Sequence, residues 1–490
     1  MTSRPPFLID RRRLLLAGAS AAALAACGLV APPRPMALGE GAAPAPLGDS
    51  ALLDELEART FRFFWETAHP DTGLIPDRWP AAPTMASVAS VGFGLTAYLV
   101  GVERGLVTRA QAAGRVLLTL NFLAHAPQGE APHGMAGHRG FFYHFLDMAT
   151  GTRFDERVEL STIDTALLMG GVLAAQSYFT ADDPVEARIR ALAEALYTRV
   201  DWAWAQVRGG AIVMGWTPGA GFKPFIDYHG YDEAMLLYLL AMGSPTHPAR
   251  ADSWQAFCAS YPRSWGTFMG QQHLGGAPLF WHQYSHVWVD FRGIQDEFMR
   301  DKGLDYFENS RRATLAQRAY AAANPGGWKD HGADVWGLTA CDGPGSLRTR
   351  DHAGRIRQFH DYTARGAGLI DTRDDGTIAP TAAASSLPFA PAESMAAIQA
   401  MHRRFGAQIW GRYGFLDAFN TSFVDTTARL SNGRVLPGFG WVDTDYLGID
   451  QGPIVAMIAN HRQDLVWRTM RGNPHLVSGL KRAGFRGGWL

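Results

Sequence analysis

The sequence predicts a mainly α-helical fold in which antiparallel helical hairpins form a ring. Apolar residues recur at helical spacing in roughly ten stretches, and the segments between them are long and rich in Gly, Trp and His. No alternation of strands and helices appears, which argues against a parallel α/β sheet. No segment repeats at a fixed period, so a solenoid is not expected. Loops at one end of such a ring would carry a functional site on a rigid scaffold.

Apolar spacing and capping residues justify each expected helix. Ser50 can cap the first helix, which runs to about Ala68. Thr108 and Ser161 are candidate N-caps further along the chain, and Pro453 suits the first position of the last helix. The remaining helices are expected near residues 86–103, 109–124, 161–178, 184–206, 232–242, 249–260, 310–323, 391–405 and 453–461.

The first 27 residues have the pattern of an export signal. Four arginines precede the apolar run 14–26, which is shorter than the roughly 20 residues that span a membrane. Arg11, Arg12 and Arg13 resemble a twin-arginine signal, and residues 24–27 resemble a bacterial lipobox that would acylate Cys27. An ordinary signal with a chance cysteine is the alternative. We expect a signal at 1–27, a Pro-, Ala- and Gly-rich tether at 28–48, one domain at 49–490, and a periplasmic protein anchored to a membrane by lipid.

Charge and motif content exclude several classes of protein. The formal net charge is -1, and without residues 1–26 the chain carries 41 basic and 45 acidic residues, which argues against a nucleic-acid partner. No Walker A loop, His-Glu-x-x-His or paired Cys-x-x-Cys is present, and we expect neither a metal nor an organic cofactor. Cys258 and Cys341 are expected to be free and buried. The fifteen Trp and fourteen Tyr fit core packing, and also fit stacking on sugars.

Two acidic segments stand out near expected helix starts. Glu159 lies just before the cap Ser161, so capping does not explain it, whereas Asp164 could complete a capping box with Ser161. Asp232 and Glu233 open an apolar helix beside two tyrosines and a histidine. Acidic residues at a helix start can simply complement the helix dipole, but an aromatic setting also suits a carboxyl group with a raised pKa.

Further acidic residues lie in aromatic surroundings downstream. Asp290 and Arg292 alternate with apolar residues and could form a structural ion pair or contact a ligand. Asp417 has aromatic residues on both sides and no helix to cap. Asp450 precedes an expected helix and could cap it, while Asp342 is expected in a turn. Asp443 and Asp445 belong to the same C-terminal acidic group.

Together these segments resemble the bacterial glucoamylase-like (glycoamylase-like) family, which includes endo-β-1,2-glucanases and the processing region of cyclic β-1,2-glucan synthases. The resembling stretches cover about 400 residues, and as a set they are specific: 61–65, 143–147, 159–168, 231–233, 283–293, 336–344, 414–420 and 446–460. Cys341 departs from the family pattern, in which Ser is expected. The resemblance implies an all-α (α/α)6 toroid, a glycoside hydrolase of the endo-β-glucanase type with β-1,2-glucan as the best substrate, and essential carboxylates near Glu159 and Glu233.

On this reading, glycosidic bond cleavage uses one carboxylic acid and one carboxylate. We expect Glu233 to be the general acid, and Glu159 or Asp417 to be the base that activates water with inversion. Two carboxyl groups only about 5 Å apart would instead indicate retention. The expected substrate contacts are sugar platforms at Trp216, Tyr231, Trp281 and Trp336, hydroxyl contacts at His229, Asp290 and Arg292, and further contacts at Asp164, His286, Asp342 and Asp450.

Three alternatives stay open. A polysaccharide lyase also uses helical toroids, but would favour a basic cluster for acidic sugars. A glucan transglycosylase would differ in the chain lengths of its products. A non-catalytic glycan-binding lipoprotein would bind without releasing product.

Overall fold

The structure is a computed structural model that describes residues 45–490. The predicted export signal, the acylated Cys27 and all but the last residues of the predicted tether lie outside the described residues. Within 45–490, no helix is both long and apolar enough to cross a membrane.

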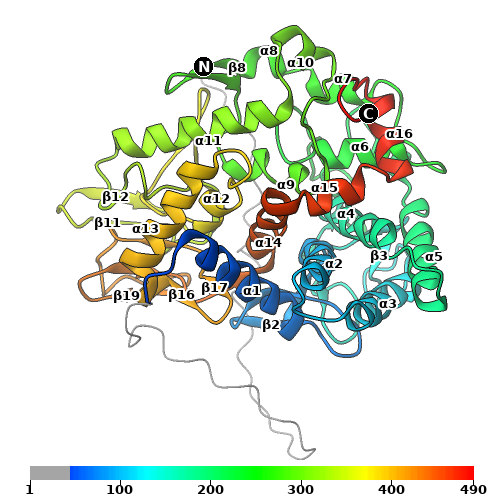
Figure 1. The fold of residues 1–490 in the computed structure, drawn as a ribbon, viewed down its shortest axis with the longest axis horizontal. Coiled ribbons are helices and arrows are strands. Elements are labelled where there is room, and N and C mark those ends of the chain that lie inside the picture. The colour runs from blue at the N-terminus through cyan, green and yellow to red at the C-terminus, as the bar shows by residue number, and fades with distance from the viewer. Residues whose placement is uncertain (1–44) are drawn as a thin grey trace, which may run out of the picture.

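Six helices lie at the centre of the molecule and are buried on nearly all sides (Figure 1). They are α2 (Val88–Glu103), α4 (Thr162–Tyr178), α6 (Met235–Gly243), α9 (Tyr284–Trp288), α12 (Pro380–Ala384) and α14 (Gly448–Gln463). Amphipathic helices cover them, each with one buried side: α1 (Asp49–Thr67), α3 (Arg109–His125), α5 (Pro184–Thr198), α11 (Tyr306–Ala323), α13 (Pro391–Ile409) and α16 (Pro474–Arg482). This arrangement follows from composition, because a helix that is apolar all round must be buried.

Glycine allows three of the central helices to pack very closely. A Cβ atom at Gly92 of α2 would lie 2.3 Å from the carbonyl oxygen of Leu167 in α4, and one at Gly171 would lie 2.0 Å from the Gly92 oxygen. Gly448, the first residue of α14, is in the same kind of contact with Ser90 near the start of α2. Equivalent positions therefore face one another, and α2, α4 and α14 run in the same direction.

Hydrogen bonds show the same alignment for the other central helices. The Ser285 hydroxyl of α9 accepts a hydrogen bond from the Leu236 backbone N–H of α6, and each residue is the second of its helix. The Thr381 hydroxyl of α12 donates to the backbone oxygen of Asp450 in the first turn of α14. All six central helices thus begin at one end of the molecule, which we call the helix-start end.

Short antiparallel strands lead into this end. One sheet has the strand order β21-β1-β2-β5, formed by Tyr446–Leu447, Pro76–Trp79, Ala82–Ser87 and Phe145–Asp147, and β2 and β21 run directly into α2 and α14. Smaller sheets contain β3 (Gly137–His138), β4 (Phe141–Phe142), β6 (Leu160–Ser161), β7 (Gly215–Trp216), β8 (Trp265–Phe268), β9 (Gln271–Leu274), β10 (Ala340–Cys341), β11 (Leu347–Arg350), β12 (Ile356–Phe359), β13 (Thr363–Ala364), β14 (Gly366–Ala367), β15 (Thr372–Arg373), β16 (Trp410–Gly411), β17 (Gly414–Phe415), β18 (Phe419–Asn420), β19 (Arg434–Leu436) and β20 (Gly440–Val442).

The prediction of a mostly helical protein is confirmed, but the expectation of an all-α protein is not, because the long loops contain these strands. Thr108 and Ser161 cap α3 and α4 as expected. Ser50 does not cap α1, which begins at Asp49, and Pro453 lies inside α14 rather than at its first position. The expected helix at 184–206 ends at Thr198 and is followed by a separate 3₁₀ turn.

The remaining short helices were not expected from the sequence, apart from α7 (Ser253–Cys258) within the expected 249–260 helix. They are α8 (Tyr261–Ser264), α10 (Glu297–Lys302) and α15 (Leu465–Met470), and the central helices α9 and α12 are also only five residues long. A helix of one turn shows no periodic pattern, so tertiary contacts rather than local sequence define it. Cys258 and Cys341 are free as predicted, although only Cys341 is fully buried.

Candidate functional site

The structure brings the main predicted carboxylates to the helix-start end. Glu159 directly precedes β6 and α4, Asp164 lies in the first turn of α4, and Glu233 lies two residues before α6. Asp450 lies in the first turn of α14. Because α4, α6 and α14 start side by side, acidic residues from distant parts of the chain share one end of the fold.

Three buried aspartates form a cluster beside α14. Asp342 follows β10, Asp417 lies between β17 and β18, and Asp443 follows β20. One carboxylate oxygen from each lies within 4.8 Å of the other two, and the side chains are at most 2% exposed. The Asp342 backbone N–H donates to Asp417 Oδ2 at 2.8 Å. This spacing would also allow oxygen coordination of a cation, so the expectation of no metal stays a prediction.

Burial and mutual repulsion raise the pKa values of two of these carboxylates. Burial, and then the negative charges of Asp450 and Asp342, raise the pKa of Asp417 well above its usual value. Burial also raises the pKa of Asp443, which faces the charges of Asp342, Asp417 and Asp445. Such groups share protons, and a shared proton can be donated to a bound molecule.

A buried arginine borders the cluster and was not predicted. Arg78 in β1 donates from Nη1 to Asp342 Oδ2 at 2.7 Å and from Nε to Asp77 Oδ2 at 3.2 Å, and its Nη1 lies 3.8 Å from Asp445 Oδ2. The Asn432 amide also donates to Asp342. Nothing in the local sequence marks Arg78, because only the pairing of β1 with β21 brings it to the C-terminal aspartates.

A second acidic group precedes α6. Asp232 is 8% exposed and its Oδ1 accepts a hydrogen bond from the Ala234 backbone N–H at 2.9 Å. Burial and the adjacent negative charge of Glu233 raise the pKa of Asp232 well above its usual value. Glu233 itself is half-buried, so its carboxyl group can reach a ligand while lying in a partly desolvated setting.

A third group surrounds the start of α4. Glu159 Oε1 lies 2.8 Å from His144 Nδ1, and Asp164 Oδ1 lies 3.5 Å from His144 Nε2. The Ser161 hydroxyl, which caps the helix, also donates to Asp164 Oδ2 at 2.5 Å. His144 was not singled out from the sequence, although it lies in the family-like stretch 143–147.

The predicted sugar platforms differ in exposure. Trp281 is partly exposed, and the His229 side chain is 55% exposed, so both can meet a ligand. Trp216 and Tyr231 are only 8% and 4% exposed, so little of either ring can meet a sugar. Trp336 is fully buried, and its prediction as a sugar platform is wrong because a stacked sugar needs an open ring face.

Three predicted substrate contacts belong instead to the structural core. Asp290 follows α9 at the opposite end of the central helices and is bonded to Arg292 and Arg471. Arg292 also pairs with Asp464, which follows the end of α14. His286 is 1% exposed, and burial lowers its pKa to about 3, so it is a neutral core histidine. Asp290 and Arg292 thus form a structural ion pair, which was the alternative to the predicted contact with a ligand.

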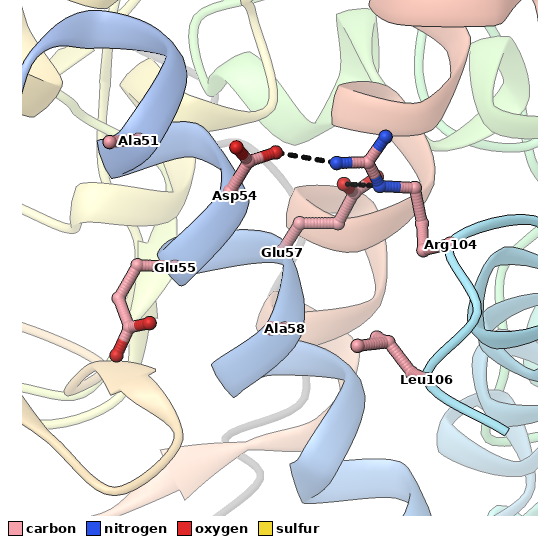
Figure 2. Close-up of a pocket in the computed structure, with 7 residues that line it drawn as sticks. All are labelled: Ala51, Asp54, Glu55, Glu57, Ala58, Arg104 and Leu106. Atoms are coloured by element: carbon pink, nitrogen blue, oxygen red, sulfur yellow. Dashed lines mark hydrogen bonds and ion pairs between the residues drawn. The ribbon is translucent and has the colours of Figure 1, made fainter.

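A surface pocket of about 350 Å³ also lies at that opposite end (Figure 2). Its polar lining comes mainly from the start of α1, and Arg104 bonds both Asp54 and Glu57 across it. It contains none of the predicted site residues. These acidic groups are already matched by arginines, so this pocket is not the candidate site.

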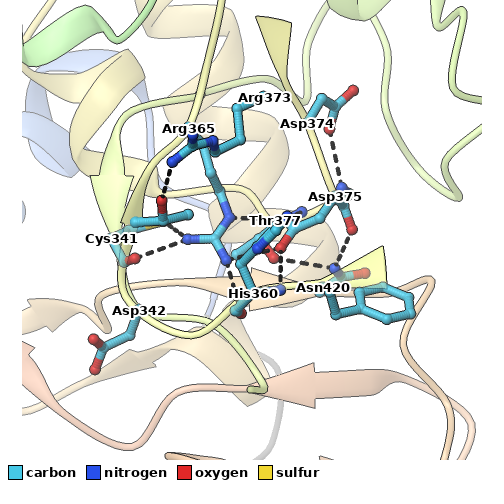
Figure 3. A network of polar contacts seen from close by, with 12 residues as sticks. Cys341, Asp342, His360, Arg365, Arg373, Asp374, Asp375, Thr377 and Asn420 are labelled. Carbon is cyan, nitrogen blue, oxygen red and sulfur yellow. Dashed lines mark hydrogen bonds and ion pairs between the residues drawn. The ribbon is translucent and has the colours of Figure 1, made fainter. Parts of the chain in front are cut away.

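A buried ion pair supports the strand that carries Asp342 (Figure 3). Arg365 is fully buried and donates to Asp375 at 2.8 and 2.9 Å. The same guanidinium donates to the backbone oxygen of Cys341 at 2.8 Å. Asp342 is the next residue, so this pair fixes the backbone from which the aspartate cluster extends.

Comparison with known proteins gives the family. The glycoamylase family model, described as "putative glucoamylase", matches residues 226–474. A solved structure from Bacteroides uniformis with the same description is 32% identical, covers 91% of this chain and 100% of its own, and has a TM-score of 0.78. The chain therefore belongs to the glycoamylase-like family, and the resemblance predicted from the sequence is confirmed.

Two further relatives have more specific names. An endo-β-1,2-glucanase from Chitinophaga pinensis, solved with sophorotriose and glucose, is 28% identical over 91% of this chain and 100% of its own, with a TM-score of 0.76. An exo β-1,2-glucooligosaccharide sophorohydrolase (non-reducing end) from Parabacteroides distasonis is 28% identical over 468 residues. The match covers 89% of this chain and spans 58% of the length of that relative.

Proposed function

We propose that this protein is a glycoside hydrolase that cleaves β-1,2-glucan. The observation that carries the proposal is the convergence of Glu159, Glu233 and the buried aspartates at one end of the central helices, in a chain of this family. The two relatives named above act, by their names, on β-1,2-linked glucose chains. No cofactor is needed, because glycosidic bond cleavage is a proton-transfer reaction shared between carboxyl groups.

In this proposal the helices form an (α/α)6 toroid. The six central helices, all starting at one end, make the inner ring, and α1, α3, α5, α11 and α13 make most of the outer ring, while α16 packs against α6. Such a ring places the loops before each inner helix around one mouth. The site residues come from these loops.

We assign the general acid to Glu233 and the base to Glu159. In the reaction, water forms a bond to the anomeric carbon and gives its proton to Glu159, while the glycosidic bond breaks and the leaving oxygen takes the proton of Glu233. Asp417 is the weaker candidate for the base, because burial and the neighbouring aspartates raise its pKa, whereas a base must be ionised. It is better suited to donating a hydrogen bond to a sugar hydroxyl or a water.

The direct test is to incubate the protein with linear glucans of β-1,2, β-1,3, β-1,4 and α-1,4 linkage and to measure the products by mass spectrometry. Hydrolysis of β-1,2-glucan alone supports the proposal. A ladder of oligomers indicates endo action, and release of sophorose alone indicates exo action. Longer chains than the substrate would indicate a transglycosylase, unsaturated products a lyase, and binding without products a non-catalytic glycan-binding protein.

The cellular location is a separate proposal, carried by the twin-arginine and lipobox patterns in residues 1–27. We infer that the protein is exported and anchored by acylation of Cys27. Incorporation of labelled palmitate that is lost in Cys27→Ala would support the anchor. A wild-type protein that is released unlabelled would contradict it.

A further inference from the structure

His144 is placed to control the proposed base, and nothing in the reaction described so far uses it. Its ring lies between two carboxylates, with Nδ1 2.8 Å from Glu159 Oε1 and Nε2 3.5 Å from Asp164 Oδ1. The two carboxylates come from opposite sides of the Ser161 cap. The histidine therefore joins the loop before α4 to the first turn of that helix.

The ring is held rigidly in this position. The His144 backbone N–H donates to the Glu159 backbone oxygen at 2.9 Å. The His144 backbone oxygen accepts a hydrogen bond from the backbone N–H of Val88, at the start of α2, at 3.2 Å. The ring stacks on Phe145 with centroids 3.9 Å apart. The backbone and the side chain of Glu159 are thus both bonded to the same residue.

This geometry favours a positively charged ring. A neutral imidazole has one N–H and one lone pair, so it would turn the lone pair towards one of the two carboxylates. Only the imidazolium donates from both nitrogens, and its charge offsets one of the two negative charges. The other charged group acting on Glu159 is Arg153, whose guanidinium lies over the Tyr143 ring.

Solvent exposure identifies which of His144, Asp164 and Glu159 faces the substrate. The His144 and Asp164 side chains are 5% and 2% exposed, whereas the Glu159 side chain is 18% exposed. We propose that His144, as an imidazolium that faces Asp164, is a positioning residue that orients Glu159 for attack by water. This inference rests on the proposed function, because it assigns Glu159 the role of base.

The main test is His144→Asn, which can retain one hydrogen bond to Glu159 but carries no charge. We expect kcat to fall roughly 10- to 100-fold, the loss typical of a catalytic group displaced by about 1 Å, with KM within about threefold of the wild type. The loss of kcat should vary with pH, because the variant lacks a ring whose charge changes with pH. A purely structural role would lower kcat by the same factor at every pH.

The matched control is His402→Asn, which changes an equally buried histidine on α13, whose ring packs against Trp410. It should leave kcat and its pH profile unchanged. Asp164→Asn should repeat the effect of His144→Asn in weaker form, and the double variant should lose less than the product of the two single losses. Wild-type kcat in His144→Asn, or the same loss of kcat at every pH, would overturn the proposal.

A second measurement does not depend on activity. ¹⁵N NMR of histidine-labelled wild-type protein, with the His144 signals assigned by their loss in His144→Asn or His144→Gln, should show both ring nitrogens protonated at pH 7. A neutral ring at that pH would overturn the proposal. If the wild type cleaves none of the glucans, the proposed function fails, while the NMR result still decides whether the charged bridge exists.

Discussion

The buried carboxylates on the two sides of Cys341 have pKa values that are shifted in opposite directions. Burial alone would raise the pKa of Asp375, but the charge and hydrogen bonds of Arg365 outweigh burial and lower it to about 2 (Figure 3). Asp417 and Asp443 are buried as deeply, yet their nearest charged neighbours are other aspartates, and their pKa values rise. Depth of burial therefore does not distinguish a structural carboxylate from one in the candidate site. The charge of the neighbouring group does. This comparison predicts that changes at paired carboxylates cost stability, while changes at unbalanced ones cost activity.

The largest effect is expected at Glu233, which lies next to the buried Asp232. Glu233→Gln keeps the shape of the side chain but cannot protonate a leaving group, so kcat on β-1,2-glucan should fall by about 10²- to 10⁴-fold. The melting temperature should stay close to the wild-type value. Glu297→Gln is the matched control, since Glu297 is an exposed glutamate in the first turn of α10. Near-normal turnover by Glu233→Gln would remove it from the mechanism.

Breaking the balanced pair should instead unfold the protein more easily. Arg365→Met leaves Asp375 charged and buried without its partner, and the free energy of unfolding should fall by about 3–5 kcal/mol. Urea denaturation measures this loss. The double variant Arg365→Met/Asp375→Leu removes both charges and should recover part of it. Equal stability of Arg365→Met and the wild type would contradict the role given to this pair.

The unbalanced cluster should give the protein an unusual pH dependence. A carboxyl group with a raised pKa in the fold stabilises it below the pKa of the unfolded chain, about 3.9 for Asp. This stabilisation is lost as pH rises through the higher folded pKa. Asp443→Asn should therefore flatten the decline of the free energy of unfolding above about pH 4. Parallel stability curves for the two proteins, measured in urea from pH 4.5 to 8, would rule out proton uptake at Asp443.

The smallest effect is expected at Cys341, which lies between the two groups. Its Sγ is 3.4 Å from Arg365 Nη1, and Ser, the residue expected in the family pattern, can accept a hydrogen bond there. Cys341→Ser should change the free energy of unfolding by less than about 1 kcal/mol and leave kcat unaltered. A loss of several kcal/mol would show that the sulfur packs in a way that oxygen cannot replace.

The sequence was sufficient to predict the long helices and the acidic segments, because both leave local patterns. Apolar spacing locates α2 and α4, and the position of Glu159 before a capped helix distinguishes it from a capping residue. The partners of these groups leave no such pattern. Arg78 and His144 reach the carboxylates only through strand pairing. An aromatic setting marked both Asp417 and Asp290, and only the fold shows that Asp290 is also bonded to the distant Arg471.

The close packing of α2 against α4 through Gly92 and Gly171 has a consequence for the spacing of the site. With only hydrogen atoms between the two backbones, the distance between these helices is near the smallest that two helices can have. Their starts carry the Ser87 cap and the Ser161 cap. Any side chain at either glycine would widen the ring and carry Glu159 and Asp164 away from the sheet that holds Arg78. Gly92 and Gly171 therefore fix the distance between the two helix starts near which the charged side chains of the site lie.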